Sequence, residues 1–215
     1  YRFFMEKEIY EQPEVLSDTI MGRALDETIC FEELAGFDLN SVENITLCAC
    51  GTSFHAALLA SYLFEQKSKL KCDVEIASEF RYKDPIINKN SLFIVISQSG
   101  ETADTLEALK MAKEAGVKTL AICNVDNSSI VRLTDRAILT RAGIEKGVGS
   151  TKAFATQMMV LWMLALYMAK QRKTNCGLQS ELDAIRHIPK VLKKSLRHHE
   201  KLSRLSKRYL HGHGF

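Results

Sequence analysis

The sequence predicts a doubly wound α/β fold: a five-stranded parallel sheet with helices on both faces and helical extensions at both ends of the chain. Two observations predict it. Five short apolar runs show little polar alternation, which is typical of strands covered on both faces. Helical patterns lie between them, and this alternation favours parallel strands joined by right-handed crossovers. The runs are Ile45–Cys50, Val74–Ala77, Leu92–Ser97, Thr119–Asn124 and Ala137–Thr140.

The helical patterns between the runs carry local signals of their own. Ser53–Lys67 places small and apolar side chains on one face. Thr102–Ala115 is followed by Gly116, which is a favourable residue just after a helix end. Ser128–Thr134 predicts a short helix. Two longer helical patterns follow the last strand, at Thr151–Arg172 and Glu181–Tyr209.

The first 35 residues predict amphipathic helices. Met5–Tyr10 has a helical pattern, and Pro13 begins or interrupts the next helix. Because the chain does not start with Met and residues 212–215 resemble a turn before a new strand, we expect a piece of a longer protein. The predicted parts are linker helices at 1–40, an α/β domain at 41–175 and a basic connecting helix at 176–215.

The composition is that of a globular protein, with 46% hydrophobic and 26% charged residues. The longest apolar run, Met158–Ala169, is about 12 residues long, whereas a membrane span needs about 20. We therefore interpret it as a buried helix. The first five residues are followed at once by Glu6, Lys7 and Glu8, so no signal peptide is predicted at this end. We expect a cytoplasmic protein.

The six cysteines predict reduced thiols, as is usual in the cytoplasm. Cys48 and Cys50 are the one close pair, and no second pair completes a zinc site. No metal or organic cofactor is expected. The six are Cys30, Cys48, Cys50, Cys72, Cys123 and Cys176.

The charge is unevenly distributed along the chain. Residues 170–215 carry twelve basic and three acidic side chains, a net charge of +9, whereas the preceding residues have a net charge of −6. A basic tail can bind nucleic acid. No aromatic residues alternate with these charges, so we favour a solvated helix face over a nucleic-acid partner.

Two hydroxyl-rich turns predict an anion site. Ligands of open parallel sheets bind beyond the carboxyl ends of the strands, where the strand order reverses. The first and third runs are each followed there by a turn that leads into a helix, whose free N–H groups attract anions. Gly100 lets the backbone turn closely. The candidate phosphate donors are Ser53, Ser97, Gln98, Ser99 and Thr102.

The chemistry of these turns favours a small phosphomonoester, because neither turn contains Lys or Arg. The alternative is that the hydroxyls only cap their helices, which is the usual role of a single such residue. We favour the anion site because two neighbouring turns share the pattern. The sequence has neither the Walker P-loop motif nor the three-glycine dinucleotide fingerprint, which excludes those two nucleotide folds.

Four segments resemble the sugar isomerase (SIS) domain family, and a fifth precedes the domain. Together they resemble the glucosamine-6-phosphate synthases, which make glucosamine 6-phosphate from fructose 6-phosphate and glutamine. The segments are Cys50–Ser53, Glu75–Tyr82, Ser97–Thr105 and Gly147–Phe154, preceded by Glu6–Pro13.

This resemblance implies a flavodoxin-like SIS fold, with phosphate bound by the five donors named above. It implies that the sugar contacts Cys50, Gly51 and Thr52 and that Val148 and Ser150 line the same pocket. The family has an upstream glutaminase domain, a second SIS domain that supplies the catalytic Glu, Lys and His residues, and a homodimeric assembly. No catalytic residue is therefore expected in this chain. The alternative is a sugar-phosphate sensor module without catalysis.

Overall fold

The protein contains one five-stranded parallel sheet in the strand order β2-β1-β3-β4-β5. A computed structural model describes residues 1–210 and 212. This order confirms the predicted flavodoxin-like, doubly wound topology. The strands are β1 Asn44–Ala49, β2 Lys71–Ile76, β3 Ser91–Ser97, β4 Lys118–Cys123 and β5 Arg136–Leu139.

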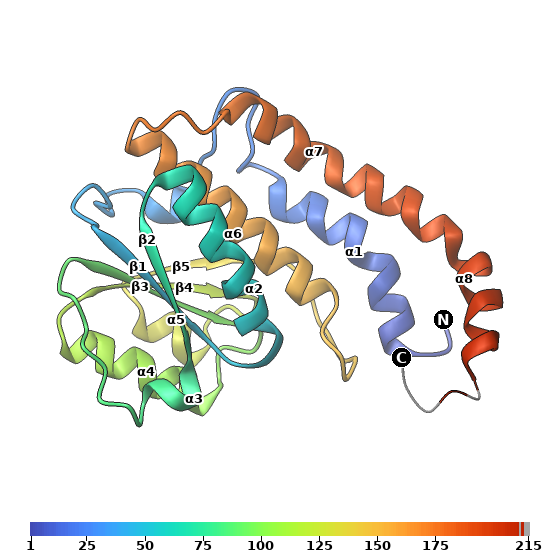
Figure 1. The fold of residues 1–215 in the computed structure, drawn as a ribbon, viewed down its shortest axis with the longest axis horizontal. Coiled ribbons are helices and arrows are strands. Elements are labelled where there is room, and N and C mark those ends of the chain that lie inside the picture. Colours follow the sequence, from blue (N-terminus) through green and yellow to red (C-terminus); the bar gives the residue numbers. More distant parts are fainter. Residues whose placement is uncertain (211, 213–215) are drawn as a thin grey trace.

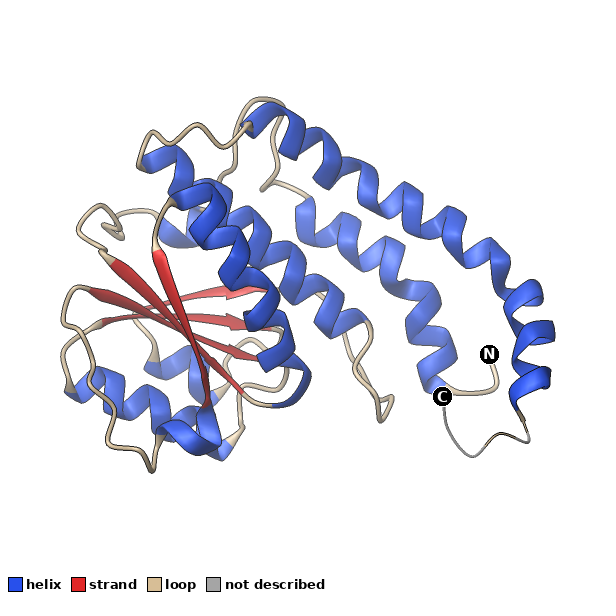
Figure 2. Ribbon diagram, in the orientation of Figure 1, coloured by secondary structure: helices blue, strands red, loops and turns tan. Residues whose placement is uncertain are grey.

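Helices cover both faces of the sheet (Figures 1 and 2). The central strand β3 shows why, since all seven of its residues are buried. Ile94 points into the core cluster beneath one helical layer, and its neighbours Phe93 and Val95 point into the cluster on the opposite face. The first layer holds α2 Gly51–Leu63 and α6 Lys152–Gln171; the second holds α3 Ala77–Phe80, α4 Ala103–Glu114 and α5 Ser129–Leu133.

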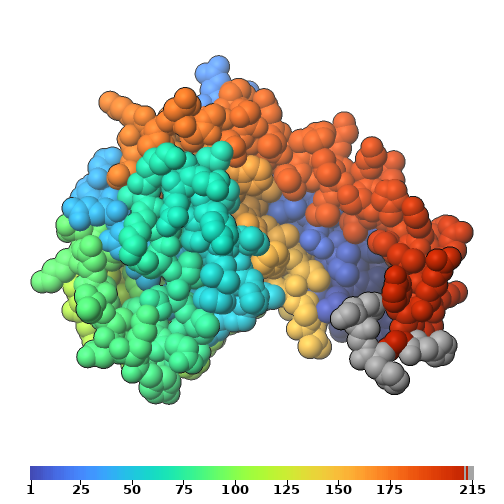
Figure 3. All heavy atoms as spheres, in the orientation of Figure 1, coloured from blue at the N-terminus to red at the C-terminus, as the bar shows by residue number. Residues whose placement is uncertain are grey.

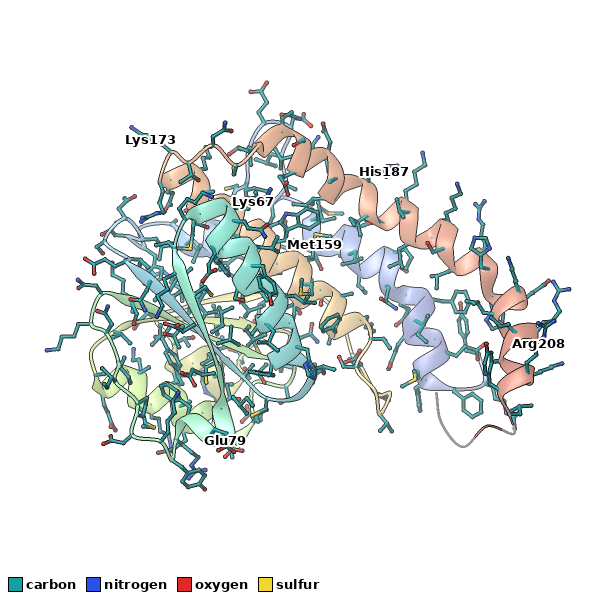
Figure 4. The ribbon with its side chains drawn as sticks, viewed as in Figure 1. Lys67, Glu79, Met159, Lys173, His187 and Arg208 are labelled. Carbon is teal, nitrogen blue, oxygen red and sulfur yellow. The ribbon has the colours of Figure 1, made fainter. Side chains whose placement is uncertain are left out.

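Helix α6 is the main core helix of the first layer. Within the described residues it alone is long and apolar enough to cross a membrane, but 72% of its apolar window is buried inside the protein. Met159, labelled in Figure 4, lies in this buried cluster with Leu16 and Ile20 of the N-terminal helix. The interpretation of the apolar run as a buried helix is therefore confirmed.

The N-terminal segment forms one continuous helix, α1 Phe4–Ile20, with Pro13 inside it. The prediction that Pro13 begins or interrupts a helix was wrong. Proline lacks the N–H that would bond the carbonyl of Ile9. The side-chain amide of Gln12 donates to that oxygen instead, at 3.3 Å, so the carbonyl is not left unpaired.

Residues 21–35 were also predicted to be helical, and here too the structure differs. They form turns closed by an isolated bridge between Ala24 and Ile29, followed by the short 3-10 helix η1 Glu32–Leu34. The carbonyl of Arg23 accepts from the amide of Cys30 at 2.8 Å. Side chains such as Ile29 and Phe31 are buried in the core below the turns, so their apolar pattern reflects packing rather than helix formation.

The basic C-terminal segment runs alongside α1 as an arm that extends away from the sheet (Figure 1). It is divided into α7 Leu178–Ser195, η3 Leu196–His198, α8 His199–Ser206 and η4 Lys207–Tyr209, rather than the single predicted helix. His187 and Arg208 point into solvent (Figure 4), in agreement with a solvated basic face. The predicted turn at 212–215 lies outside the described residues except for Gly212.

Candidate functional site

The two hydroxyl-rich turns leave adjacent strands at the same edge of the sheet. Ala49 of β1 pairs with Ile96 of β3, so the next residues, Cys50 and Ser97, emerge side by side. The chain continues from β1 to β2 on one side, whereas β3 and β4 lie on the other. The turns therefore meet where the strand order reverses, which is the usual ligand position in this fold.

The first turn presents unpaired donors at the start of α2. Gly51 has a φ of +57°, a left-handed conformation that glycine adopts without strain. Ser53 is buried and Thr52 is exposed, and neither hydroxyl forms a hydrogen bond within the described part of the chain. The amides of Gly51, Thr52 and Ser53 belong to the first helical turn, where no carbonyl of the same helix is available to them.

In the second turn two hydroxyls shape the backbone. Ser97 Oγ accepts from the amide of Gly100 at 2.9 Å, and Ser99 Oγ accepts from the amide of Glu101 at 3.2 Å. As each hydroxyl acts as acceptor in these contacts, its own proton stays available to a ligand. Thr102 precedes α4, but its side chain makes no capping hydrogen bond. This finding argues against capping as the reason for Thr102.

A third turn, at residues 124–128 between β4 and α5, packs against the second turn. A Cβ on Gly100 would lie 2.1 Å from Ser128 Oγ, so only glycine fits there. The carbonyl of Gly100 accepts from the amide of Ile130 at 3.0 Å. Glu101 accepts from the amide of Ser129 at 2.8 Å, and this hydrogen bond lowers the pKa of Glu101. The Glu101 carboxylate is thus tied to the start of α5.

The acidic side chain in the first turn of α4 is paired with a cation. Asp104 lies in the first turn of α4, and Arg81 donates to its Oδ1 at 3.0 Å. Neither turn contains a basic side chain. The positive potential for an anion therefore comes from the oriented amides and hydroxyls at the two helix N-termini.

The structure places Val148 and Ser150 on the loop that joins β5 to α6. Val148 is fully exposed and lines a cavity of about 850 Å³, together with Phe4 and Leu202. Ser150 Oγ donates to Glu145 Oε2 at 3.1 Å. Among the described residues no hydrogen bond joins this loop to the two turns, so the place of Val148 and Ser150 in a sugar pocket stays a prediction.

Sequence reasoning missed the carboxylates that hold this loop. Glu145 Oε1 accepts from the amides of Thr151 and Ala153, and so takes the place of a side-chain cap at the start of α6. Glu8, from α1, accepts from the amides of Lys146 and Gly147. The capping role of Glu145 could have been predicted, because it is an acidic residue shortly before an apolar helix. No local pattern indicated that Glu8 would bind the amides of Lys146 and Gly147.

Comparison with known proteins agrees with this fold. The chain is 63% identical over its full length to the glutamine–fructose-6-phosphate aminotransferase [isomerizing] of Campylobacter jejuni and 48% identical to that of Helicobacter pylori. It spans 36% of the length of each. A solved structure, the C-terminal domain of glucosamine-fructose-6-phosphate aminotransferase from Francisella tularensis, superimposes with a TM-score of 0.91 at 40% identity. That match covers 97% of this chain and 60% of the other.

The SIS domain family matches residues 38–167, which is more than half of the chain. The matched region contains the whole sheet, both hydroxyl-rich turns and most of α6. From the fold, the position of the turns and this match, the chain belongs to the SIS domain family.

Proposed function

We propose that the chain binds the phosphate of fructose 6-phosphate or glucosamine 6-phosphate at the turns Cys50–Ser53 and Ser97–Thr102. One observation carries the proposal: unpaired hydroxyls and free helix-start amides from two adjacent strands converge at the switch point of the sheet. A phosphate dianion supplies the acceptors that these donors lack. The names of the two curated relatives support a fructose 6-phosphate substrate.

In this proposal the chain orients the substrate. Phosphate contacts made by Ser53, Ser97 and Thr102 fix one end of the sugar, and the binding energy of that remote group holds the reacting carbons in place. Gln98 and Ser99 complete the phosphate donors. Cys50, Gly51 and Thr52 then lie against the sugar, with Val148 and Ser150 lining the same pocket. The groups that move protons come from another part of the protein.

We further propose that the chain works within a glutamine-dependent synthase of the cytoplasm that assembles as a homodimer. A glutaminase domain and a second SIS domain would be joined to it in the same polypeptide. The relatives support this, because the chain spans 36% of their length. Light scattering of the complete protein tests the dimer, and release of glutamate from glutamine tests the synthase against the sensor alternative.

Calorimetric titration with glucosamine 6-phosphate tests the phosphate site. The informative variant combines Ser53→Ala with Thr102→Ala, because neither hydroxyl bonds another described residue and folding is spared. Each lost hydrogen bond to the phosphate should cost about 1.5–3 kcal/mol. Ser61→Ala, on the same α2 with only a local bond to the carbonyl of Leu58, is the control. Unchanged affinity in the double variant contradicts the assignment.

A further inference from the structure

Helix α1 reaches the loop between β5 and α6 with a buried carboxylate. Glu8 is 3% exposed. Its Oε1 accepts from the amides of Lys146 and Gly147, at 2.5 and 3.1 Å, and its Oε2 accepts from the amide of Gly147 at 3.0 Å. The partners are separated by more than 130 residues in sequence, and Figure 3 shows the loop beside the dark blue N-terminal residues.

The loop is built to lie against α1. A Cβ on Gly147 would lie 2.4 Å from Glu8 Oε2 and 3.3 Å from the Cα of Met5. A Cβ on Gly149 would lie 2.6 Å from the Cε of Met5. Gly147 therefore permits a close approach to the Glu8 carboxylate and the α1 backbone, whereas at Gly149 the flexible end of Met5 could move aside.

A second carboxylate of α1 holds the far end of the same loop. Glu11 Oε2 accepts from Lys152 Nζ at 2.8 Å, and the Lys152 side chain is 5% exposed. This hydrogen bond lowers the pKa of Glu11, helped by Lys7 at 3.1 Å. Glu8 and Glu11 are one helical turn apart, so a single face of α1 binds residues 146–152 at both ends.

Packing of α1 does not need a carboxylate at position 8. Burying one is costly unless hydrogen bonds replace its water, and here the loop amides do so. The rest of the buried face is mostly apolar, including Val15, Leu16 and Ile20. The ionic contacts therefore specify the conformation of the loop rather than the attachment of the helix.

We propose that Glu8, assisted by Glu11, is a positioning residue that fixes residues 146–150 for contact with the sugar. This inference rests on the proposed function, which places Val148 and Ser150 of that loop against the substrate. It assigns a role to the segment Glu6–Pro13, which precedes the SIS domain match. Glu8 touches no substrate itself and acts through the loop backbone.

Hydrogen exchange tests the structural half of the inference without any ligand. In the 215-residue chain, Glu8→Ala should speed exchange of the Lys146 and Gly147 amides about tenfold or more, with the sheet amides unchanged. Glu14→Ala is the matched control, because Glu14 is exposed on the same helix. Glu8→Gln keeps one acceptor oxygen and should fall between the two, even if the alanine variant folds poorly. Equal exchange in all variants overturns the inference.

Ligand affinity tests the positioning half. Glu8→Ala should weaken glucosamine 6-phosphate about tenfold, while inorganic phosphate, which needs the two turns alone, binds as before. Glu8→Gln should restore part of the loss. Faster exchange with unchanged sugar-phosphate affinity overturns the positioning role, and so does an equal loss of both ligands, which signals general damage. A wild-type chain that binds neither ligand refutes the proposed function. The exchange rates of Lys146 and Gly147 would still test the contact between Glu8 and the loop.

Discussion

Gly100 shows how one residue serves two turns at once. Its φ of +68° forms the bend after Ser99, and its missing side chain leaves room for Ser128. Any Cβ there would also meet Cys123 Sγ at 2.8 Å. The position thus demands glycine for conformation and for space, and it couples the hydroxyl-rich turn Ser97–Thr102 to the turn after β4.

A pair of glycine substitutions separates these two demands. Gly116 has a φ of +74°, and a Cβ added there would have no neighbour within 4 Å. Gly116→Ala should therefore introduce only left-handed strain, about 1 kcal/mol. Gly100→Ala adds the clash with Ser128 and should cost about 1–3 kcal/mol more. Urea unfolding of both variants measures the difference. Equal losses would show that the contact with Ser128 imposes no constraint.

At the scale of elements, Asp135 joins three of them at the far edge of the sheet. It lies just before β5 and accepts from Lys113 Nζ of α4 at 2.5 Å. It also accepts from the amide and hydroxyl of Thr119 in β4, at 2.8 and 2.9 Å. Partial burial works to raise the pKa of Asp135, but these hydrogen bonds outweigh burial and lower it.

This arrangement predicts a loss of stability in acid. A carboxyl whose pKa is lower in the folded protein stabilises it above the unfolded pKa of about 3.9, and this contribution disappears as the pH falls through the folded value. Asp135→Asn should cost about 1–2 kcal/mol at pH 7, because the site is partly solvated. The gap to wild type should narrow as the pH falls below about 3.9 and through the lower pKa of the folded protein. Asp18→Asn, at an exposed position, is the control; a constant gap across pH contradicts the assignment.

The elements also show how far sequence reasoning reaches. The apolar run Leu92–Ser97 lies within β3, since burial on both faces leaves a signal in the residues themselves. The hydroxyl-rich turns were equally visible because they follow such runs directly. The continuity of α1 through Pro13 could not be predicted, because proline usually ends or kinks a helix and the bond from Gln12 to the carbonyl of Ile9 is visible only in the folded chain. The contact of Glu8 with Lys146 joins distant parts of the chain and emerges only from the folded arrangement.

At the scale of the whole molecule, the candidate site lies at the edge of the sheet, whereas an apolar cavity of about 850 Å³ lies elsewhere. That cavity is between the start of α1, the loop at 146–148 and the residues around η3 and α8. The two features meet through the loop, whose Val148 lines the cavity and whose Ser150 is proposed to face the sugar. The loop is therefore one of several contacts between the helical arm and the α/β domain, together with the ion pair of Lys67 with Glu181 at 2.6 Å.

The arrangement of charged groups predicts binding without turnover in the 215-residue chain. Moving a proton between two sugar carbons needs a free acid–base group at the sugar. Two acidic side chains in and just after the second hydroxyl-rich turn are engaged: Glu101 with the amide of Ser129, and Asp104 with Arg81. His55, in the first turns of α2, packs against the ring of Phe54. The donors that remain at the turns are hydroxyls and amides, which hold a phosphate but do not take a carbon-bound proton at neutral pH.

The chain should therefore bind glucosamine 6-phosphate while leaving the sugar unchanged. Proton NMR in D₂O measures this directly, because isomerisation of fructose 6-phosphate would replace a carbon-bound proton with deuterium. We expect no deuterium incorporation above the rate in buffer, with saturable binding in the same sample. Incorporation that is saturable and abolished by Ser53→Ala with Thr102→Ala would show a proton-transferring group in this chain. If no deuterium is incorporated, the result agrees with a chain that binds the phosphate at the two turns and transfers no proton itself.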